Sequence, residues 1–574
     1  MKKTDLRSLD ALFRPQSVAV IGASRKRFQI GHEIVRNLVL GGFTGPVYPV
    51  NPMAKVVHSM LCFPKVTAIP GPVDLAIITV PAPLVLPAAK DCARKGVKGL
   101  VVITAGFGEI GGEGTVLQNE LVALCKKHGI RMIGPNCMGI LNTAVEFAMN
   151  SSFAAATPTR GGAAFLSQSG ALGEAILTDA RSLGIGVSMF ASVGNRADVS
   201  PCDLLDYWDE DPNTQQILMY LEAFGEPERF MDAARRISPR KPILVVKSGR
   251  SAQGARAAVS HTGSLAGSEA AVDSLLNQCG VLRVDTMKDL FALASAVQTG
   301  KRPKGKKVAI VTNAGGPAIL ATDACIANGL EIPELSAATR KKMEKGMPPE
   351  ASSVNPVDLI ASADAARFDL ALGATLADSN IDMVLAIFVS PIMIDAAAVA
   401  EVFAKHAAST DKPLLACLLG KSHSERASDI LREKGVPNYR FPEEAAFSLA
   451  NMYKLQKLRT RDNKPAPHYR VRKGKARAAL DRAIADGRPM LNGLELNDLF
   501  TAYGIPLVPS RIVNTREQAL RAARSLGFPM VAKVEAEDIV HKSDRGGVIV
   551  GIRNREELLD AYDRLEEIFG KECP

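Results

Sequence analysis

The sequence predicts an α/β protein that contains several parallel sheets with helices on both faces. The first observation is a repeated pattern in which a short Val/Ile/Ala strand enters a Gly/Ser turn and then a helix. It occurs in "SVAVIGAS" (17–24), "GAAFLSQSGALGEAIL" (162–177) and "KKVAIVTNAGGPAILATDACIANG" (306–329). Such buried strands with small-residue turns are typical of parallel sheets. The second observation is length, because 574 residues exceed one hydrophobic core and predict about three to five domains.

The first predicted domain covers residues 1–150. After the strand at 17–21, the segments "VDLAIITVPA", "GLVVITAGF" and "RMIGPNCMGIL" are expected to be later strands, each with a polar turn at its carboxyl end. Ligands of open α/β sheets bind at such ends. The turn "GAS" at 22–24 lacks the full G-x-G-x-x-G fingerprint, so it does not support ordinary dinucleotide oxidoreduction. Taken alone, it is equally compatible with tight strand–helix packing.

Four further segments follow. Residues 151–303 contain the strands "GVSMFASVGN", "QILMYLEAF" and "PILVVKSGR", and residues 304–456 contain "MVLAIFVSP" and "PLLACLLG". The polar stretch 457–475 is interpreted as a linker. Residues 476–574 change character, because "LFTAYGIPLVPSRIVNTREQALRAARSLGFPMVAKVEA" predicts helix, strand, helix and strand in turn.

Composition excludes some classes of function. Aromatic residues make up only 5% of the chain, with the single Trp208, which argues against stacking platforms for nucleic acid. The net charge of +10 is distributed along the chain, which favours a small anionic ligand such as a nucleotide or coenzyme A. No nucleic-acid motif accompanies it, so no nucleic-acid partner is predicted.

Cysteine usage and the first residues bear on location. The nine cysteines are scattered and none forms C-x-x-C, which indicates reduced thiols in a cytoplasmic protein. The opening "MKKTDLRSLDALFRP" has charges but no apolar core, so it does not read as a secretory signal. No apolar run reaches the length of a bilayer span, and no membrane partner is expected.

One histidine lies in an unusual setting. In "AVSHTGSLAGS" (258–268) His261 is surrounded by small residues, with no other His or Cys at a metal-ligand spacing. Gly263 and Gly267 allow tight turns, and Ser264 or Ser268 could cap the following helix. On these residues alone, His261 is either a surface-loop histidine or a group that meets an anion held at a helix N-terminus.

The motifs together resemble the nucleoside-diphosphate-forming (NDP-forming) acyl-CoA synthetases, relatives of succinyl-CoA synthetase. The resemblance covers essentially the whole chain, and its most specific pieces are "RMIGPNCMG", "SQSGALGEA", "VSHTGSLAGS" and "AKVEAEDIVHKSDRGGV". It implies a Rossmann-like CoA-binding domain, two flavodoxin-like domains of the succinyl-CoA-synthetase type, and the first lobe of an ATP-grasp domain. It also implies an acid–thiol ligase that reversibly couples thioester formation to ATP and ADP.

The resemblance assigns the chemistry to three residues. His261 is implied to carry phosphate received from an acyl phosphate, since a neutral imidazole is nucleophilic near pH 7. Glu222, in "MYLEAFGE", matches a glutamate that orients this histidine, although it could also be a solvent-facing residue at a strand end. His541 resembles a second histidine that carries phosphate between distant sites. The alternative is a surface pair with Asp538 or Asp544.

The resemblance also assigns binding residues. The turn at Ser167, Ser169 and Gly170 is implied to hold phosphoryl oxygens, although Ser169 could be an ordinary helix cap. Lys533 matches a lysine that contacts nucleotide phosphates. Cys137 has no evident base beside it, so a wall position is favoured over a nucleophile. The residues implied to contact coenzyme A are Gly22, Ala23, Ser24, Lys55, Pro81, Ala82, Asn136 and Cys137.

The sequence ends at "EEIFGKECP". The second half of an ATP-grasp domain, with adenine contacts and acidic Mg²⁺ ligands, is expected to lie outside it, so no metal ligand is predicted here. The expected ligands are coenzyme A, ATP or ADP, Mg²⁺, phosphate, and a small carboxylate or its acyl-CoA. A homo-oligomer is expected, and this chain alone is not expected to convert ADP to ATP.

Two other classes of function stay open at this point. One is a CoA-binding regulatory or scaffold protein of the same family without complete nucleotide chemistry. The other is a protein acyltransferase, which would need an appended acetyltransferase domain, and none is visible. The presence of both His261 and Glu222 favours the ligase.

Overall fold

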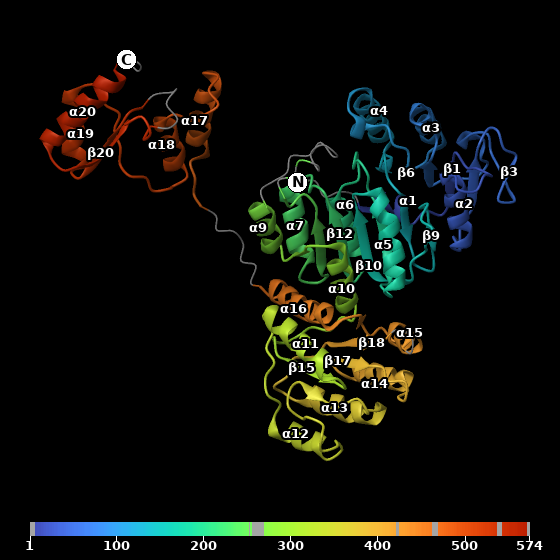
Figure 1. Ribbon diagram of the computed structural model, residues 1–574. Helices are drawn as coiled ribbons and strands as arrows, with labels where there is room; N and C mark the ends of the chain where they lie inside the picture. The colour runs from blue at the N-terminus through green and yellow to red at the C-terminus, as the bar shows by residue number, and fades with distance from the viewer. Residues whose placement is uncertain are drawn as a thin grey trace. The chain divides into compact units, whose positions relative to one another are not determined.

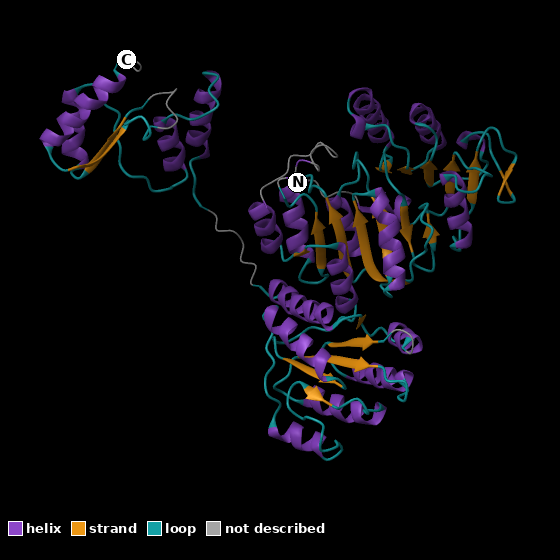
Figure 2. Cartoon of the chain, viewed as in Figure 1, coloured by secondary structure: helices purple, strands orange, loops and turns teal. Residues whose placement is uncertain are grey.

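The computed structural model describes residues 6–251, 253–254, 256, 269–420, 424–461, 469–535 and 542–570. The chain divides into two units, Met1–Asn463 and Lys464–Pro574 (Figure 1). Three sheets with mainly parallel strands make up the first unit, and helices flank them (Figure 2). The predicted α/β class with parallel sheets is therefore confirmed.

The first sheet has the strand order β2-β1-β5-β6-β7 and is parallel throughout. Every residue of β1, β5 and β6 is buried, as expected for strands covered on both faces. A small hairpin, β3 (Val56–Val57) and β4 (Met60–Leu61), follows β2. The strands are β1 (Val18–Ile21), β2 (Val47–Val50), β5 (Leu75–Ile78), β6 (Gly99–Val102) and β7 (Arg131–Ile133). The helices are η1 (Leu6–Leu9), α1 (Asp10–Phe13), α2 (Ile30–Leu40), η2 (Val66–Ala68), α3 (Ala82–Lys95), η3 (Gly108–Ile110) and α4 (Gly112–His128).

The second sheet has the order β14-β13-β12-β10-β11-β8-β9, with β8 and β9 added in antiparallel fashion at one edge. A capping box at Ser200 and Asp203 begins α6, which explains why this helix starts at Pro201. The strands are β8 (Ile140–Asn142), β9 (Met149–Asn150), β10 (Arg160–Ser167), β11 (Val187–Ser192), β12 (Gln216–Leu221), β13 (Ile243–Lys247) and β14 (Leu282–Val284). The helices are α5 (Gly170–Ser182), α6 (Pro201–Glu210), α7 (Pro227–Ile237), α9 (Glu269–Gln278) and α10 (Met287–Val297).

The third sheet has the order β16-β15-β17-β18-β19 and is also parallel. Its last helix, α16, packs against α10 and α11, so that one hydrophobic core joins the second and third sheets. The strands are β15 (Val308–Thr312), β16 (Val357–Asp358), β17 (Met383–Val389), β18 (Leu414–Leu419) and β19 (Asn438–Tyr439). The helices are α11 (Gly315–Ala327), α12 (Ala337–Glu344), α13 (Ala365–Ala377), α14 (Ala396–Ser409), α15 (Glu425–Glu433) and α16 (Pro442–Arg459).

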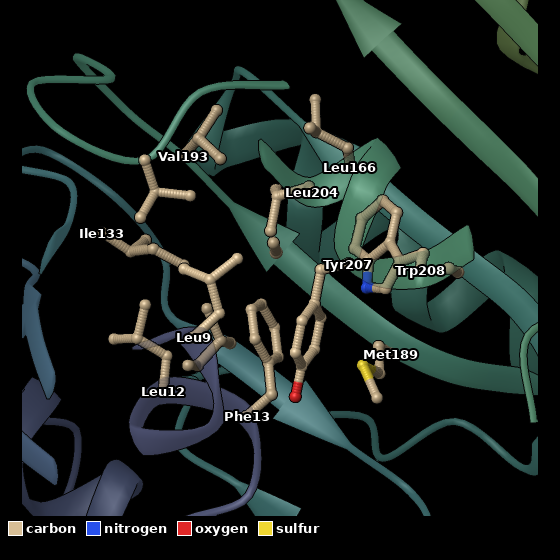
Figure 3. Close-up of a cluster of buried hydrophobic side chains, with 14 of the residues drawn as sticks. Leu9, Leu12, Phe13, Ile133, Leu166, Met189, Val193, Leu204, Tyr207 and Trp208 are labelled. Carbon is tan, nitrogen blue, oxygen red and sulfur yellow. The ribbon is translucent and has the colours of Figure 1, made fainter. Parts of the chain in front are cut away.

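The first residues of the described chain connect the first sheet to the second. Phe13 stacks on Tyr207 of α6 with a centroid distance of 5.3 Å, beside the fully buried Trp208 (Figure 3). The Tyr207 hydroxyl donates to Asp10 at 2.8 Å, and Arg14 pairs with Asp211 at 3.1 Å. These contacts place two predicted domains in a fixed relation, since both contribute side chains to one core.

The second unit is smaller. A two-stranded antiparallel sheet packs with its helices around Ala519, Ala523, Ile552, Leu558 and Ala561. Its elements are α17 (Lys473–Ala485), α18 (Gly493–Ala502), α19 (Arg516–Leu526), β20 (Met530–Lys533), β21 (Val548–Ile552) and α20 (Arg555–Phe569). Within the described ranges of both units, no helix has the length and apolar character needed to cross a bilayer.

Candidate active site

The first sheet forms a crevice at its topological switch point. The connection from β2 to β5 passes over β1, so the strand order reverses between β1 and β5. In open parallel sheets, ligands bind beyond the carboxyl ends of the strands at this point. Gly22 follows β1, while Pro81 and Ala82 begin α3 after β5. The structure therefore brings these predicted CoA-contacting residues to one edge of the sheet.

Close packing explains the glycine at position 22. Gly22 has a φ of +93°, and an added Cβ would lie 2.5 Å from Oγ1 of Thr79. A Cβ on Gly31 of α2 would lie only 2.1 Å from the Gly22 carbonyl oxygen. Both positions need glycine because the helix and the neighbouring strand end approach the turn so closely.

Hydrogen bonds fix the rest of this turn. The Asn51 side-chain amide donates to the Ala23 carbonyl at 2.8 Å, and His32 Nδ1 donates to the Ser24 carbonyl at 3.1 Å. Ser24 Oγ accepts the Lys26 N–H at 3.1 Å. Lys55 is exposed and directly precedes the β3–β4 hairpin, where its ammonium group is accessible to an anion.

The loop after β7 carries Asn136 and Cys137. Asn136 has a φ of +59°, and its N–H donates to the Thr104 carbonyl at 3.0 Å. Cys137 is 4% exposed and donates its thiol to the Val102 carbonyl at 3.2 Å. Burial raises the pKa of this thiol to about 12. The thiol is therefore protonated near neutral pH, which is consistent with a wall residue and not with a nucleophile.

The turn at Ser167–Gly170 lies beside that loop. An added Cβ on Gly170 would lie 3.7 Å from the Met138 nitrogen and 3.9 Å from the Cys137 carbonyl carbon. The Ser169 hydroxyl accepts the Leu172 N–H at 3.4 Å as the cap of α5, and the Ser167 hydroxyl donates to the Ser169 carbonyl at 2.7 Å. Both hydroxyls thus shape the turn. The first N–H groups of α5 point out of the amino end of the helix.

Glu222 follows β12 and is held by a residue that the sequence analysis missed. Gln168, which is buried between Ser167 and Ser169, accepts the N–H groups of Glu222 at 2.6 Å and of Ala223 at 3.0 Å. Its amide also donates to the Ala223 carbonyl at 2.7 Å. Gln168 therefore locks the Glu222 backbone to the Ser167–Gly170 turn. Its position inside "SQSG" was the available signal.

Arg196 is a second residue that the sequence analysis missed. Its guanidinium donates to the Ala223 carbonyl at 3.1 Å. Burial lowers the pKa of Arg196, and the nearby Glu222 carboxylate opposes that shift. The arginine thus contributes positive charge beside Glu222.

His261 and His541 lie outside the described residues, so the structure gives no geometry for either. Lys247, the last residue of β13, is buried near Glu222, and burial followed by the neighbouring Arg283 charge lowers its pKa. Lys533 ends β20, is exposed, and pairs in register with Val548 of β21. Glu222 therefore lies directly after β12 and Lys533 at the end of β20, and neither is related to its expected histidine by the described residues.

Metal ligands are not evident in what the structure describes. Among residues 6–251, 253–254, 256, 269–420, 424–461, 469–535 and 542–570, no group of three or more His, Cys, Asp or Glu side chains could hold a metal ion.

Comparison with protein families divides the chain into four matched segments. A CoA binding domain matches residues 16–143, and a succinyl-CoA ligase like flavodoxin domain matches residues 160–297. A Ligase-CoA domain matches residues 308–461, and an ATP-grasp domain matches residues 482–574. The first three matched segments each contain the principal strands of a different parallel sheet. The fourth lies in the second unit.

Individual relatives give the same picture. The chain is 37% identical over 553 residues to 4-hydroxybutyrate–CoA ligase [ADP-forming] of Nitrosopumilus maritimus, covering 96% of this chain and 79% of that protein. It is 38% identical over 460 residues to subunit alpha of acetate–CoA ligase [ADP-forming] I of Pyrococcus furiosus, covering 79% of this chain and 99% of the subunit. A further 91 residues are 35% identical to subunit beta of that enzyme, covering 16% of this chain and 39% of the subunit.

A solved structure also resembles most of the chain. It is the dinucleotide forming acetyl-coenzyme A synthetase 1 of Ca. Korarchaeum cryptofilum in complex with phosphate and ADP. Its TM-score is 0.74 at 37% identity, and the match covers 79% of this chain and 97% of that one.

Proposed function

The chain belongs to the NDP-forming acyl-CoA synthetase family, and we propose that its residues carry the family's reaction through an acyl phosphate and a phosphorylated His261. Its relatives are ADP-forming ligases that join a carboxylic acid to coenzyme A, which makes this chain an acid–thiol ligase. The single observation that best supports the proposed path is the proximity of Gly170 to Cys137 and Met138. It brings the expected phosphate turn next to the expected CoA loop.

Coenzyme A is proposed to lie in the crevice of the first sheet. The turn Gly22–Ser24 and the exposed Lys55 would hold phosphate groups, with Lys55 as a point charge. Pro81 and Ala82, at the start of α3, and Asn136 would contact the pantetheine chain. Cys137 would form part of the wall near the thiol end, since its own thiol stays protonated.

The proposed reaction has three balanced steps. Phosphate attacks the acyl-CoA carbonyl, so the C–S bond breaks, an acyl phosphate forms, and the CoA thiolate takes up a proton. A neutral His261 nitrogen then attacks phosphorus, and the carboxylate leaves. ADP finally attacks the phosphohistidine, which yields ATP and restores the histidine. Run in reverse, ATP drives thioester synthesis.

The protein contributes positioning and charge to these steps. The amino end of α5 would stabilise the negative oxygens of the transferred phosphoryl group. Glu222 would accept a hydrogen bond from the other imidazole nitrogen of His261 and stabilise its charged form. Gln168 would keep Glu222 in place, since it binds the backbone on both sides of the residue. His541 and Lys533 would serve the nucleotide half of the reaction.

Location and assembly are proposed as well. All eight cysteines within the described residues are free thiols, which supports the cytoplasm as the compartment. An oligomer is supported by the alpha and beta subunits of the Pyrococcus furiosus relative, and we propose that this chain associates with copies of itself. Mg²⁺ would accompany the nucleotide.

The test is phosphate-dependent cleavage of acyl-CoA thioesters by the full chain, measured as CoA release across acyl groups of different size. Glu222→Ala should lower the rate at least tenfold, while Glu222→Gln should keep more activity because it retains an acceptor. Glu210→Gln, an exposed glutamate at the end of α6, is the matched control. CoA binding without phosphate-dependent cleavage of any thioester would contradict the ligase path and favour a CoA-binding regulatory role.

A further inference from the structure

A cavity of about 330 Å³ lies between the second and third sheets. Strand starts of the second sheet form one wall, α16 forms another, and the segment that joins α10 to β15 closes it. Its lining includes Gln216, Val297, Arg302, Met452, Leu455 and Arg459. Its volume is within the range of small-ligand sites.

The cavity is separate from the proposed active site. Gly162 lies near the start of β10 and Gln216 starts β12, whereas Ser167 and Glu222 lie at the far ends of the same strands. Six residues of β12 at about 3.3 Å each separate the two ends by roughly 20 Å. A ligand here would contact both sheets without contacting the expected phosphate turn.

Positive charge dominates the lining, whose described residues include five Lys or Arg and no Asp or Glu. Lys241 and Lys301 donate to backbone carbonyls, as does Arg459, and carbonyl oxygens satisfy hydrogen bonds without neutralising charge. Arg240 is paired with Asp209. Arg302 makes no hydrogen bond or ion pair with any other described residue. Burial and the Arg302 charge lower the pKa of Arg459 to about 10, so the two guanidinium groups lie near each other, and no described Asp or Glu lines the cavity beside them.

A buried polar group adds an independent indication. Gln216 is 2% exposed, and its amide nitrogen donates to the Ala294 carbonyl at 3.2 Å. Its Oε1 atom is buried and accepts no hydrogen bond from any described residue. An orphaned buried acceptor of this kind is destabilising, and a donor on a bound molecule would satisfy it.

We propose that this cavity binds a small anion that carries a phosphate or carboxylate group and a hydroxyl donor. The anionic group would lie between Arg302 and Arg459, and the hydroxyl would donate to Gln216. Val297, Met452 and Leu455 provide apolar contacts for a short carbon chain. Because its walls come from both sheets, a bound anion stabilises their present arrangement.

Calorimetry on the full chain at constant ionic strength tests the proposal with two probes that share a carbon skeleton, glycerol 3-phosphate and glycerate. At least one should bind with a dissociation constant below about 1 mM. Arg302→Gln and Arg459→Gln should each weaken that binding roughly tenfold. The probe that binds identifies the anionic group as phosphate or carboxylate. Lys454→Gln, on α16 and outside the cavity lining, is the matched control.

Gln216→Leu tests whether a hydroxyl group of the ligand donates to Gln216 Oε1. It should weaken glycerol 3-phosphate more than it weakens inorganic phosphate, which has the anionic group without the carbon chain. The proposal is overturned if neither probe binds, or if binding is unchanged in Arg302→Gln. The Arg459 side chain donates hydrogen bonds to three backbone carbonyls, so its variant can fail to fold. Arg302 is exposed and donates no hydrogen bond to another described residue, so binding by the Arg302→Gln variant is the decisive measurement.

Discussion

Substituting alanine at Gly22 tests whether the turn after β1 contacts coenzyme A. The residue has a φ of +93°, where a Cβ is strained, and the new atom would lie 2.5 Å from Thr79 Oγ1. The φ strain costs about 1–2 kcal/mol, and overlap in a packed site adds about 1–3 kcal/mol. The turn must shift to relieve the overlap, so its N–H groups no longer point at a bound phosphate.

Gly42 is a matched control in the same domain. Its φ is +79°, and an added Cβ would meet nothing within 4 Å. Gly42→Ala should therefore show the φ strain alone, with CoA affinity unchanged. Urea unfolding gives the free energy of unfolding for both variants, and calorimetry gives CoA affinity. We expect Gly22→Ala to lose the larger free energy and to bind CoA at least tenfold more weakly.

The double variant Gly22→Ala/Thr79→Ala separates the two contributions. Removing Thr79 Oγ1 eliminates the contact at 2.5 Å but leaves the backbone contact at 3.2 Å. The double variant should be less destabilised than the sum of the single variants, by about 1 kcal/mol. Strict additivity would refute the overlap argument. Wild-type CoA affinity in Gly22→Ala would refute the placement of CoA phosphates at this turn.

Two further expectations follow from the geometry. Gln168→Leu removes the acceptor for the Glu222 and Ala223 N–H groups. Histidine phosphorylation should therefore fall, as expected for Glu222→Ala, while CoA affinity stays unchanged. Gln168→Glu keeps an acceptor oxygen and should restore part of the histidine phosphorylation. Burial raises the pKa of Cys137, Cys325 and Cys417 from 9.0 to about 12. The unfolded chain therefore releases these thiol protons at lower pH than the folded chain, and the free energy of unfolding should fall between pH 9 and pH 12. Cys137→Ala should make this fall less steep in urea unfolding measured across that pH range, and an unchanged slope would contradict the assignment.

Local sequence pattern predicted where several of the proposed site residues lie in the fold. Gly22, Pro81 and Asn136 each follow a short buried strand, and parallel strands share one edge for their carboxyl ends. The same logic placed Ser169 at the start of α5, where it caps the helix. These features depend on residues next to each other in the chain, which is why the sequence alone revealed them.

Contacts between distant segments could not be predicted in this way. Gln168 and Glu222 are separated by 54 residues, and nothing near Gln168 indicates which backbone it binds. Phe13, in the first predicted domain, stacks on Tyr207, in the second. Such partners depend on how the strands are ordered, which a single sequence does not specify.

The predicted linker shows a smaller difference of the same origin. Helix α16 extends to Arg459, which lies within the stretch 457–475 that its polar composition suggested as linker. Met452 and Leu455 are buried in the core shared by the second and third sheets. Arg459 donates to the carbonyls of Ser238, Pro239 and Arg240. Tertiary contacts thus extend the helix past the point where hydrophobic residues become sparse.

The most direct test of the central claim is the location of the transferred phosphate. The full chain is incubated with an acyl-CoA and inorganic phosphate, without ADP, and acid-labile phosphate is mapped by mass spectrometry under alkaline conditions. We predict phosphate on His261, lost in His261→Ala and strongly reduced in Glu222→Ala. Labelling that persists in His261→Ala, or thioester cleavage with phosphate on another residue, would contradict it.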